Sequence, residues 1–244
     1  MEHNKDPDTE HINNVCKNLI GAKIKFNFNI TLLNGTTDSG VIENCNIVGD
    51  CMENILLPYL RAKILTIETG PKQGSPDFWN RNRKYEWELK VFKITPGFDI
   101  SNFTSYIDQL NKCKGVERKI YRTQYLIFKY SLNKTHILIE DFKLCSVWNL
   151  LLYSGKYPIS LQNKKGTWYT IRPCAFNDIS YFPEYNNNKS PNIFIKQICK
   201  SILECPNKLD DIGDKDKIVK NIELQFHKLH FAKCLDMINN LYIL

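Results

Sequence analysis

Two carboxylates and one amine stand at a spacing that could bring them together around a cation. Asp77 follows a proline, ten residues separate it from Glu88, and Lys90 lies two positions further on. Carboxylate oxygens are ligands that Mg²⁺ prefers, and substrate phosphate commonly completes its coordination. A cation there can stabilise the charge on a phosphodiester under attack, while a lysine beside it orients the attacking water. These residue types are therefore the minimum equipment for metal-assisted phosphodiester hydrolysis.

The segment around Glu88 alternates between polar and apolar residues, which is typical of a strand with one buried face. Residues two apart in a strand share a face, so Glu86, Glu88 and Lys90 point one way. The residues between them are apolar and suit a core on the opposite face. If the chain reverses at the polar turn formed by residues 80–84, Asp77 returns beside Glu88 on the neighbouring strand.

The order of these residues resembles the PD-(D/E)xK motif of a nuclease superfamily. Pro76-Asp77, ten residues and then Glu88-Leu89-Lys90 match that motif, and the strand is similar to that of type II restriction endonucleases. The resemblance implies that Asp77 and Glu88 bind Mg²⁺ and that the Leu89 carbonyl joins them. It implies that Lys90 acts on the attacking water. The implied activity is hydrolysis of double-stranded DNA at a short palindromic sequence by a homodimer.

Members of this superfamily often add an acidic residue from an upstream helix. Glu53 lies on a predicted helix over residues 50–62 and is the first choice for this position, with Glu43 and Glu68 as rivals. The motif does not fix the spacing to this residue, so all three remain candidates. In length and in its motif strand, the chain is also similar to the NgoBV/NlaIV group of restriction enzymes.

The elements that must position these residues follow a mixed order along the chain. Apolar periodicity predicts a helix over residues 9–20, a strand over 22–33, a helix over 50–62 and strands around the motif. A helix capped by Ser101, further strands and a hairpin over 158–171 follow, and two helical patterns cover the tail. This order predicts an α/β (α+β) fold, restriction-endonuclease-like, with a mixed central sheet flanked by helices and a mostly helical C-terminal part.

Two features of the sequence interrupt the predicted helices and strands and bear on how the chain divides into domains. Pro58 lies inside the predicted 50–62 helix and favours a kink or break there, because proline lacks an amide donor. Residues 176–190 are rich in asparagine and proline, as loops are. We therefore expect residues 1–175 to form the nuclease core, together with a DNA-contacting hairpin. Residues 176–244 would be a helical extension of the same domain.

Basic residues outnumber acidic ones by 33 to 26, which tilts the chain towards a polyanionic partner such as DNA. Lysine and arginine neutralise phosphates, and arginine and amide side chains can also read base edges. The candidate DNA contacts lie in or beside two polar turns: Arg81, Arg83, Lys84, Lys164, Lys165 and Arg172. Residues 112–122 and 186–189 are further basic segments. Any one of these segments could equally be an ordinary solvated turn.

Two other interpretations compete with this one. The first keeps the hydrolysis and changes the DNA substrate, and the second involves no catalysis. A repair nuclease or junction resolvase of the same superfamily would use the same residues on another DNA substrate. A non-catalytic nucleic-acid-binding protein would carry Glu88 and Lys90 as a solvated pair on an exposed strand, where such pairs contribute little. A zinc site is not expected at His227 and His230, because no third ligand accompanies them.

The remaining sequence features concern the cellular compartment. The N-terminal residues lack the apolar segment of a secretory signal, and no apolar run approaches the length of a membrane span. The nine cysteines are an odd number and are scattered, which suits reduced thiols rather than a disulfide framework. We therefore expect a cytoplasmic protein without a membrane partner.

Overall fold

The computed structural model of the chain forms two compact units, each built from separate stretches of sequence. The first unit comprises residues 1–98, 124–145 and 175–181, and the second comprises residues 99–123, 146–174 and 182–244. The structure describes residues 7–25, 29–31, 33, 35, 37–39, 45–70, 75–94, 97–133, 136–151, 157–173, 190–209 and 211–241. Among these residues, no helix combines the length and the apolar character needed to span a membrane.

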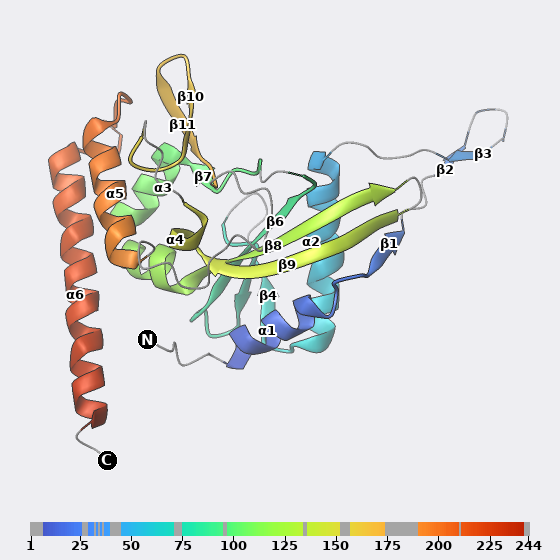
Figure 1. The fold of residues 1–244 in the computed structure, drawn as a ribbon, viewed down its shortest axis with the longest axis horizontal. Coiled ribbons are helices and arrows are strands. Elements are labelled where there is room, and N and C mark those ends of the chain that lie inside the picture. Colours follow the sequence, from blue (N-terminus) through green and yellow to red (C-terminus); the bar gives the residue numbers. More distant parts are fainter. Residues whose placement is uncertain are drawn as a thin grey trace. The chain divides into compact units, whose positions relative to one another are not determined.

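The first unit is built on a six-stranded sheet with the strand order β1-β9-β8-β6-β5-β4 (Figure 1). Its strands are β1 (Lys23–Lys25), β4 (Ile67–Thr69), β5 (Phe78–Asn80), β6 (Glu86–Phe92), β8 (Thr123–Asn133) and β9 (His136–Ser146). β1 pairs antiparallel with β9, β4 with β5, and β5 with β6. A separate two-stranded ribbon joins β2 (Asn29–Thr31) to β3 (Thr37–Ser39). The strand that carries Glu88, β6, therefore lies inside the main sheet, between β5 and β8.

Two helices complete the first unit, α1 (Pro7–Lys17) and α2 (Cys45–Lys63). α2 contacts β4 and β6 and buries one residue per turn in their core: Val48, Met52, Leu56 and Leu60. Contrary to the expectation of an interruption, α2 is not broken at Pro58 but continues to Lys63. The buried residues Leu56 and Leu60 flank Pro58, and their packing offsets the hydrogen bond that proline cannot make.

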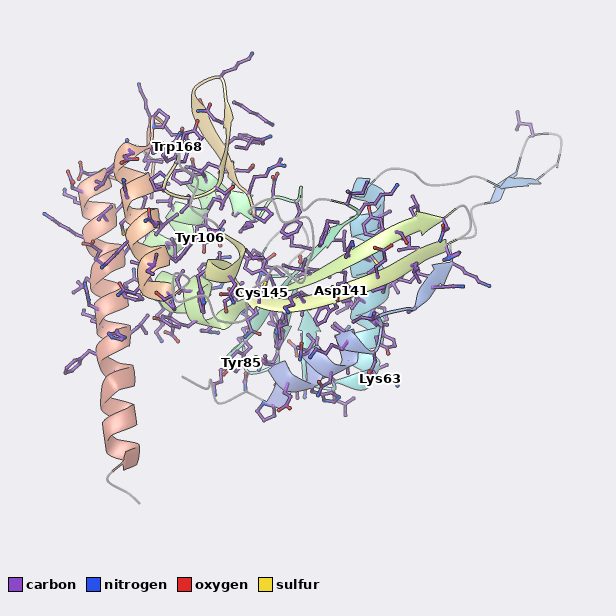
Figure 2. The ribbon with its side chains drawn as sticks, in the orientation of Figure 1. Lys63, Tyr85, Tyr106, Asp141, Cys145 and Trp168 are labelled. Carbon is purple, nitrogen blue, oxygen red and sulfur yellow. The ribbon has the colours of Figure 1, made fainter. Side chains whose placement is uncertain are left out.

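The hairpin of β5 and β6 carries the motif residues. Its register is given by two cross-strand pairs, Phe78 with Trp87 and Trp79 with Glu86. Phe78 and Trp87 are buried in the core of the first unit, so their face of the hairpin points into protein. At the turn, the Asn80 side-chain oxygen accepts a hydrogen bond of 3.0 Å from the amide of Tyr85, which is labelled in Figure 2. The turn therefore holds the two strands in this one register.

The second unit contains a three-stranded sheet, in the order β10-β11-β7, and several helices. Its elements are β7 (Ser101–Asn102), α3 (Phe103–Asn111), a π-helix η1 (Glu117–Arg122), α4 (Val147–Leu150), β10 (Leu161–Lys164), β11 (Thr167–Ile171), α5 (Pro191–Glu204) and α6 (Lys215–Leu241). α5 contacts α6, and the C-terminal part of α6 extends beyond α5 (Figure 1). From α5 onwards the described chain is therefore mostly helical, as the sequence predicts.

The N-terminal cap of α3 differs by one residue from the expected one. Asn102, not Ser101, caps the helix, because its side-chain oxygen accepts a hydrogen bond of 3.1 Å from the Ser105 amide. Asparagine and serine are equally good caps, so the local sequence does not choose between them. Both residues lie in β7, where Ser101 pairs with Ile171 and Asn102 with Thr170 of β11. The expected cap is therefore off by one residue, and the strand pairing does not distinguish the two.

The hairpin of β10 and β11 is anchored at its base and exposed at its tip. Trp168, which is labelled in Figure 2, is buried. It makes edge contacts with Phe103 and Tyr157, at ring-centroid distances of 5.5 and 5.4 Å. Asn207 brackets the Trp168 backbone, since it accepts from the amide at 2.8 Å and donates to the carbonyl at 2.7 Å. By contrast, residues 163–167 at the tip are exposed. The base is thus fixed, while the tip presents its side chains to solvent.

Candidate active site

The motif hairpin brings Asp77 and Glu88 to one face of the sheet. Continuing the observed register outward from the Phe78–Trp87 pair by one residue places Asp77 opposite Glu88. Residues that are directly opposite in an antiparallel pair share a face, with Cβ atoms about 4.5–5.5 Å apart. Lys90 is two residues along β6 from Glu88 and therefore falls on the same face.

Contacts among these side chains join them into one cluster. The Asp77 Oδ2 atom accepts a hydrogen bond of 2.6 Å from the Leu89 amide. The Lys90 Nζ atom lies 3.9 Å from Glu88 Oε2, and the Ser75 hydroxyl donates to Glu88 Oε1. Glu88 is only 6% exposed, and Asp77 and Lys90 are half-buried. Because water screens buried charges weakly, the charges in this cluster interact more strongly than they would on an open surface.

The oxygen atoms of this cluster fit a small divalent cation. Mg²⁺ is commonly held by one or two carboxylates, with water and phosphate oxygens completing its shell, and Asp77 and Glu88 supply two. In a strand, the N–H and C=O groups of one residue point to the same edge, so the Leu89 carbonyl faces the edge where its amide meets Asp77. Within the described part of the chain, no group of three or more His, Cys, Asp or Glu residues is arranged to hold a metal ion. The fit therefore rests on two carboxylates and a carbonyl.

The additional carboxylate expected from an upstream element has three candidates. Glu53 lies on α2, but its side chain is outside the described structure, and Glu43 lies outside the described residues altogether. Glu68 lies on β4 opposite Trp79, whose indole N–H donates to its Oε2 atom at 3.2 Å. Since Trp79 shares a face with Asp77, Glu68 reaches that face too. Glu68 is therefore positioned one strand beyond Asp77, on the same side of the sheet.

The cations of the β5–β6 turn have contacts within the first unit. The Arg81 Nε atom lies 3.5 Å from Glu68 Oε1, and the Arg83 guanidinium stacks over Trp79, 4.3 Å from the ring centroid. The Lys84 Nζ atom lies 5.6 Å from the ring centroid of the next residue. All three cations are exposed, and contacts of this kind are weak at exposed sites. The turn can therefore exchange these contacts for phosphate.

The cations of the β10–β11 hairpin in the second unit differ among themselves. Lys164 and Lys165 are exposed at the tip, with the Lys164 Nζ atom 4.2 Å from the ring centroid of Tyr169. Arg172 is half-buried, and its Nε atom lies 2.7 Å from Asp99 Oδ1. The two tip lysines are therefore open to a polyanion, whereas the charge of Arg172 is already balanced within its unit.

The two other basic segments proposed as DNA contacts differ in how much of them the structure describes. Residues 112–122 include η1, in which Lys119 is buried and not presented to solvent. At the start of this segment, the Lys112 Nζ atom lies 2.6 Å from Asp108 Oδ2. Residues 186–189 lie outside the described residues. Within residues 112–122, Lys112 and Lys114 are exposed and remain open to a polyanion, whereas Lys119 is not.

Sequence reasoning did not identify Ser75 as part of the cluster. The predicted strand begins at Phe78, so Ser75 falls outside it and its phase is not considered. The signal that could have identified it is its two-residue spacing from Asp77, which places both on one side of an extended chain. Because its hydroxyl holds one oxygen of Glu88, Ser75 fixes the orientation of a candidate metal ligand.

Comparisons with known proteins place the chain in a family. A family model described as NgoBV restriction endonuclease matches residues 12–237. The type II restriction enzyme NlaIV of Neisseria lactamica is 30% identical over 149 residues, which are 57% of this chain and 59% of that enzyme. The alignment thus spans about three fifths of the length of this relative.

A solved structure gives independent support for the fold. The NlaIV restriction endonuclease superimposes with a TM-score of 0.66 at 23% sequence identity, over 86% of this chain and 85% of that one. At this identity the likeness concerns the fold alone. The predicted restriction-endonuclease-like fold, a sheet flanked by helices, is thereby confirmed.

Proposed function

Because the chain belongs to the NgoBV restriction endonuclease family, we propose that it is a type II restriction endonuclease. It hydrolyses phosphodiester bonds in both strands of duplex DNA, requires Mg²⁺ and acts at a short palindromic sequence. The observation that supports this proposal is the gathering of Asp77, Glu88 and Lys90 on one face of the sheet, with Glu88 almost fully buried. Glu88 is paired there with Lys90 and Ser75, and a bound cation would bring further positive charge to its buried carboxylate.

A bound cation would be held by Asp77, Glu88 and the carbonyl of Leu89. When bound, Mg²⁺ supplies positive charge to the phosphate under attack and favours ionisation of the attacking water. Asp77 is oriented for this role by its hydrogen bond from the Leu89 amide, and Glu88 by the Ser75 hydroxyl. Both ligands are therefore fixed before substrate arrives, which reduces the reorganisation that the reaction requires.

Lys90 acts on the attacking water and on the phosphate. Its ammonium group has three donors and no acceptor, so in its charged form it orients the water and stabilises negative charge on the phosphate. Its 3.9 Å separation from Glu88 keeps it beside the cation site. Glu53 is the proposed additional carboxylate, with Glu43 and Glu68 as rivals for the same role.

DNA is bound through the cations of the two hairpins. Arg81, Arg83 and Lys84 are next to the proposed cation site in sequence and neutralise phosphates close to the cut. Lys164 and Lys165 bind phosphates from the tip of the second hairpin. Arg172 also contributes to DNA binding, and its ion pair with Asp99 is replaced by a phosphate contact when DNA binds. A homodimer would present two copies of these residues to the two halves of a palindrome, in the host cytoplasm.

The proposal is tested by incubating the purified protein with plasmid DNA in Mg²⁺, with a matched sample in excess EDTA. Discrete fragments that depend on Mg²⁺ support a site-specific endonuclease. A smear of products, or cleavage of branched DNA alone, would instead indicate a repair nuclease or a junction resolvase. Intact DNA under both conditions, together with tight binding, would indicate a non-catalytic binding protein.

Two variants connect the activity to the cluster. Asp77→Ala and Lys90→Ala are expected to abolish Mg²⁺-dependent cleavage while leaving DNA binding largely intact, because neither residue is in a hairpin turn. Arg172→Ala is a third variant, which alters a proposed DNA contact in the second unit and leaves the cluster unchanged. If Asp77→Ala and Lys90→Ala both cut DNA at the unmodified rate, the assignment of the site is wrong.

A further inference from the structure

Gly70 lies directly opposite Asp77 in the pairing of β4 with β5. The Gly70 amide donates to the Asp77 carbonyl at 2.7 Å, and four residues earlier the Thr66 carbonyl accepts from Arg81 at 2.6 Å. These bonds belong to one antiparallel ladder, in which opposite residues share a face. A side chain at position 70 would therefore point to the face that carries the Asp77 carboxylate.

The structure leaves no room for such a side chain. A Cβ atom on Gly70 would overlap the carbonyl oxygen of Pro76 and would lie 2.6 Å from its carbonyl carbon. It would also lie 3.1 Å from the carbonyl carbon of Asp77. Gly70 does not have a positive φ, so glycine is required here by close approach and not by backbone conformation.

The Pro76 carbonyl occupies this space because it has turned out of the ladder with β6. The Asn80 amide donates to the Tyr85 carbonyl at 3.2 Å, and alternation along an antiparallel pair makes residues 76 and 89 a hydrogen-bonding pair as well. The Leu89 amide instead donates to the Asp77 side chain. Proline has no amide, so residue 76 cannot donate to the Leu89 carbonyl in return.

We propose that Gly70 is a positioning residue of the cation site, because it gives the Pro76 carbonyl a place outside the ladder. With that carbonyl displaced, the Asp77 carboxylate takes the Leu89 amide, and the Leu89 carbonyl faces the site without a ladder donor from residue 76. Gly70 thereby aligns the three proposed ligands without touching the cation. This inference rests on the proposed function, since it concerns how the same site is assembled.

The expected effect of a methyl group at position 70 follows from this geometry. An ordinary non-bonded contact between heavy atoms is ~3.5–4 Å. In Gly70→Ala, the new Cβ atom and the Pro76 carbonyl oxygen must therefore move apart by on the order of 1 Å or more. A displacement of about 1 Å in a catalytic group can lower the rate about 100-fold. Because Asp77 is the next residue, we expect weaker cation binding and a cleavage rate about 100-fold lower in Gly70→Ala.

The test measures Mn²⁺ binding by electron paramagnetic resonance, since Mn²⁺ takes the same oxygen ligands as Mg²⁺. Four proteins are compared: the unmodified protein, Gly70→Ala, Asp77→Ala as the ligand-loss reference, and Thr69→Ala as the matched control. Thr69 precedes Gly70 on β4 but is exposed and pairs with Phe78 on the other face. Thermal unfolding is recorded for each, so that loss of the fold is separated from loss of the site.

The outcomes separate this inference from the proposed function. At least a tenfold loss of Mn²⁺ affinity in folded Gly70→Ala, with Thr69→Ala unchanged, supports the positioning role. Unmodified affinity in folded Gly70→Ala overturns it, even if the enzyme is active. If the unmodified protein itself binds no Mn²⁺ and cuts no DNA, it is the proposed function that fails.

A second background covers the case in which Gly70→Ala does not fold. Glycine at position 76 lets its carbonyl rotate more freely than proline does, so Pro76→Gly should relieve the collision. We expect the double variant Gly70→Ala/Pro76→Gly to fold. Its loss of Mn²⁺ affinity, measured against Pro76→Gly, should be smaller than the loss in Gly70→Ala, measured against the unmodified protein. Equal losses in both backgrounds, or a double variant that fails to fold while Pro76→Gly folds, would show that the collision with residue 76 is not the cause.

Discussion

The two hairpins of the molecule share a design in sequence but differ in what surrounds them. Both join antiparallel strands through a short basic turn, Arg81–Lys84 in the first unit and Asn163–Gly166 in the second. β5–β6 lies within a six-stranded sheet and carries a buried acid, Glu88. β10–β11 is packed at its base around Trp168 and extends exposed residues from its tip.

Burial is the physical property that separates the proposed roles of the two hairpins. Charges that are fixed and partly shielded from water, such as Glu88 and Lys90, suit a site where charge develops during a reaction. Exposed cations on a fixed base, such as Lys164 and Lys165, suit reversible neutralisation of phosphates. We therefore expect substitutions of Glu88 and Lys90 to change chemistry and substitutions of Lys164 and Lys165 to change affinity.

The largest effect is expected for Glu88→Gln. A neutral amide is a poor ligand for a hard cation, so single-turnover cleavage should fall at least ~100-fold. DNA affinity in a gel-shift assay should be unchanged or slightly higher, because one negative charge is removed from the unit that carries the proposed DNA contacts Arg81, Arg83 and Lys84. An equal loss of affinity and of rate would contradict the division of roles between the hairpins.

The next largest effect is expected for Asn207→Ala. This substitution removes two hydrogen bonds to the Trp168 backbone and should lower the free energy of unfolding by about 1–3 kcal/mol. Urea unfolding provides the measurement, and Lys208→Ala, at an exposed neighbouring position, is the control. A change in the free energy of unfolding equal to that of the control would show that the hairpin base does not depend on this residue.

A smaller effect is expected for the double variant Lys164→Ala/Lys165→Ala. Loss of two phosphate contacts should reduce the slope of log affinity against log salt concentration by about 1.8, since each contact contributes about 0.9. Cleavage at saturating DNA should keep its unmodified rate. Lys196→Ala on α5 removes an equally exposed lysine outside both hairpins and should leave the slope unchanged.

The smallest effect is expected for Arg81→Ala on stability. Its ion pair with Glu68 spans 3.5 Å between exposed groups and is worth less than ~1 kcal/mol in the free energy of unfolding. A larger effect on DNA affinity than on stability would identify Arg81 as a phosphate contact. A loss of stability well above that value would instead make it a structural residue of the first hairpin.

The resemblance to the NgoBV/NlaIV group is confirmed by the family match. It rests on residues whose types and spacing can be read directly from the sequence. The phase of β6 could be predicted because alternation along a strand is local, so Glu88 and Lys90 fall on one face whatever else the chain does. The division of the chain at residue 175 stays a prediction, since compact units are defined by contacts between distant segments.

The strands of the motif hairpin, the turn between them and the types of group on each face could be read from the residues alone, because these follow from side-chain alternation and turn chemistry over a few positions. Tertiary packing decided that Ser75 holds Glu88 and that Asp77 takes the Leu89 amide. It also decided that Gly70 lies against Pro76. Each of these depends on the register and packing of segments that are separated along the chain, which no local pattern of residues can encode.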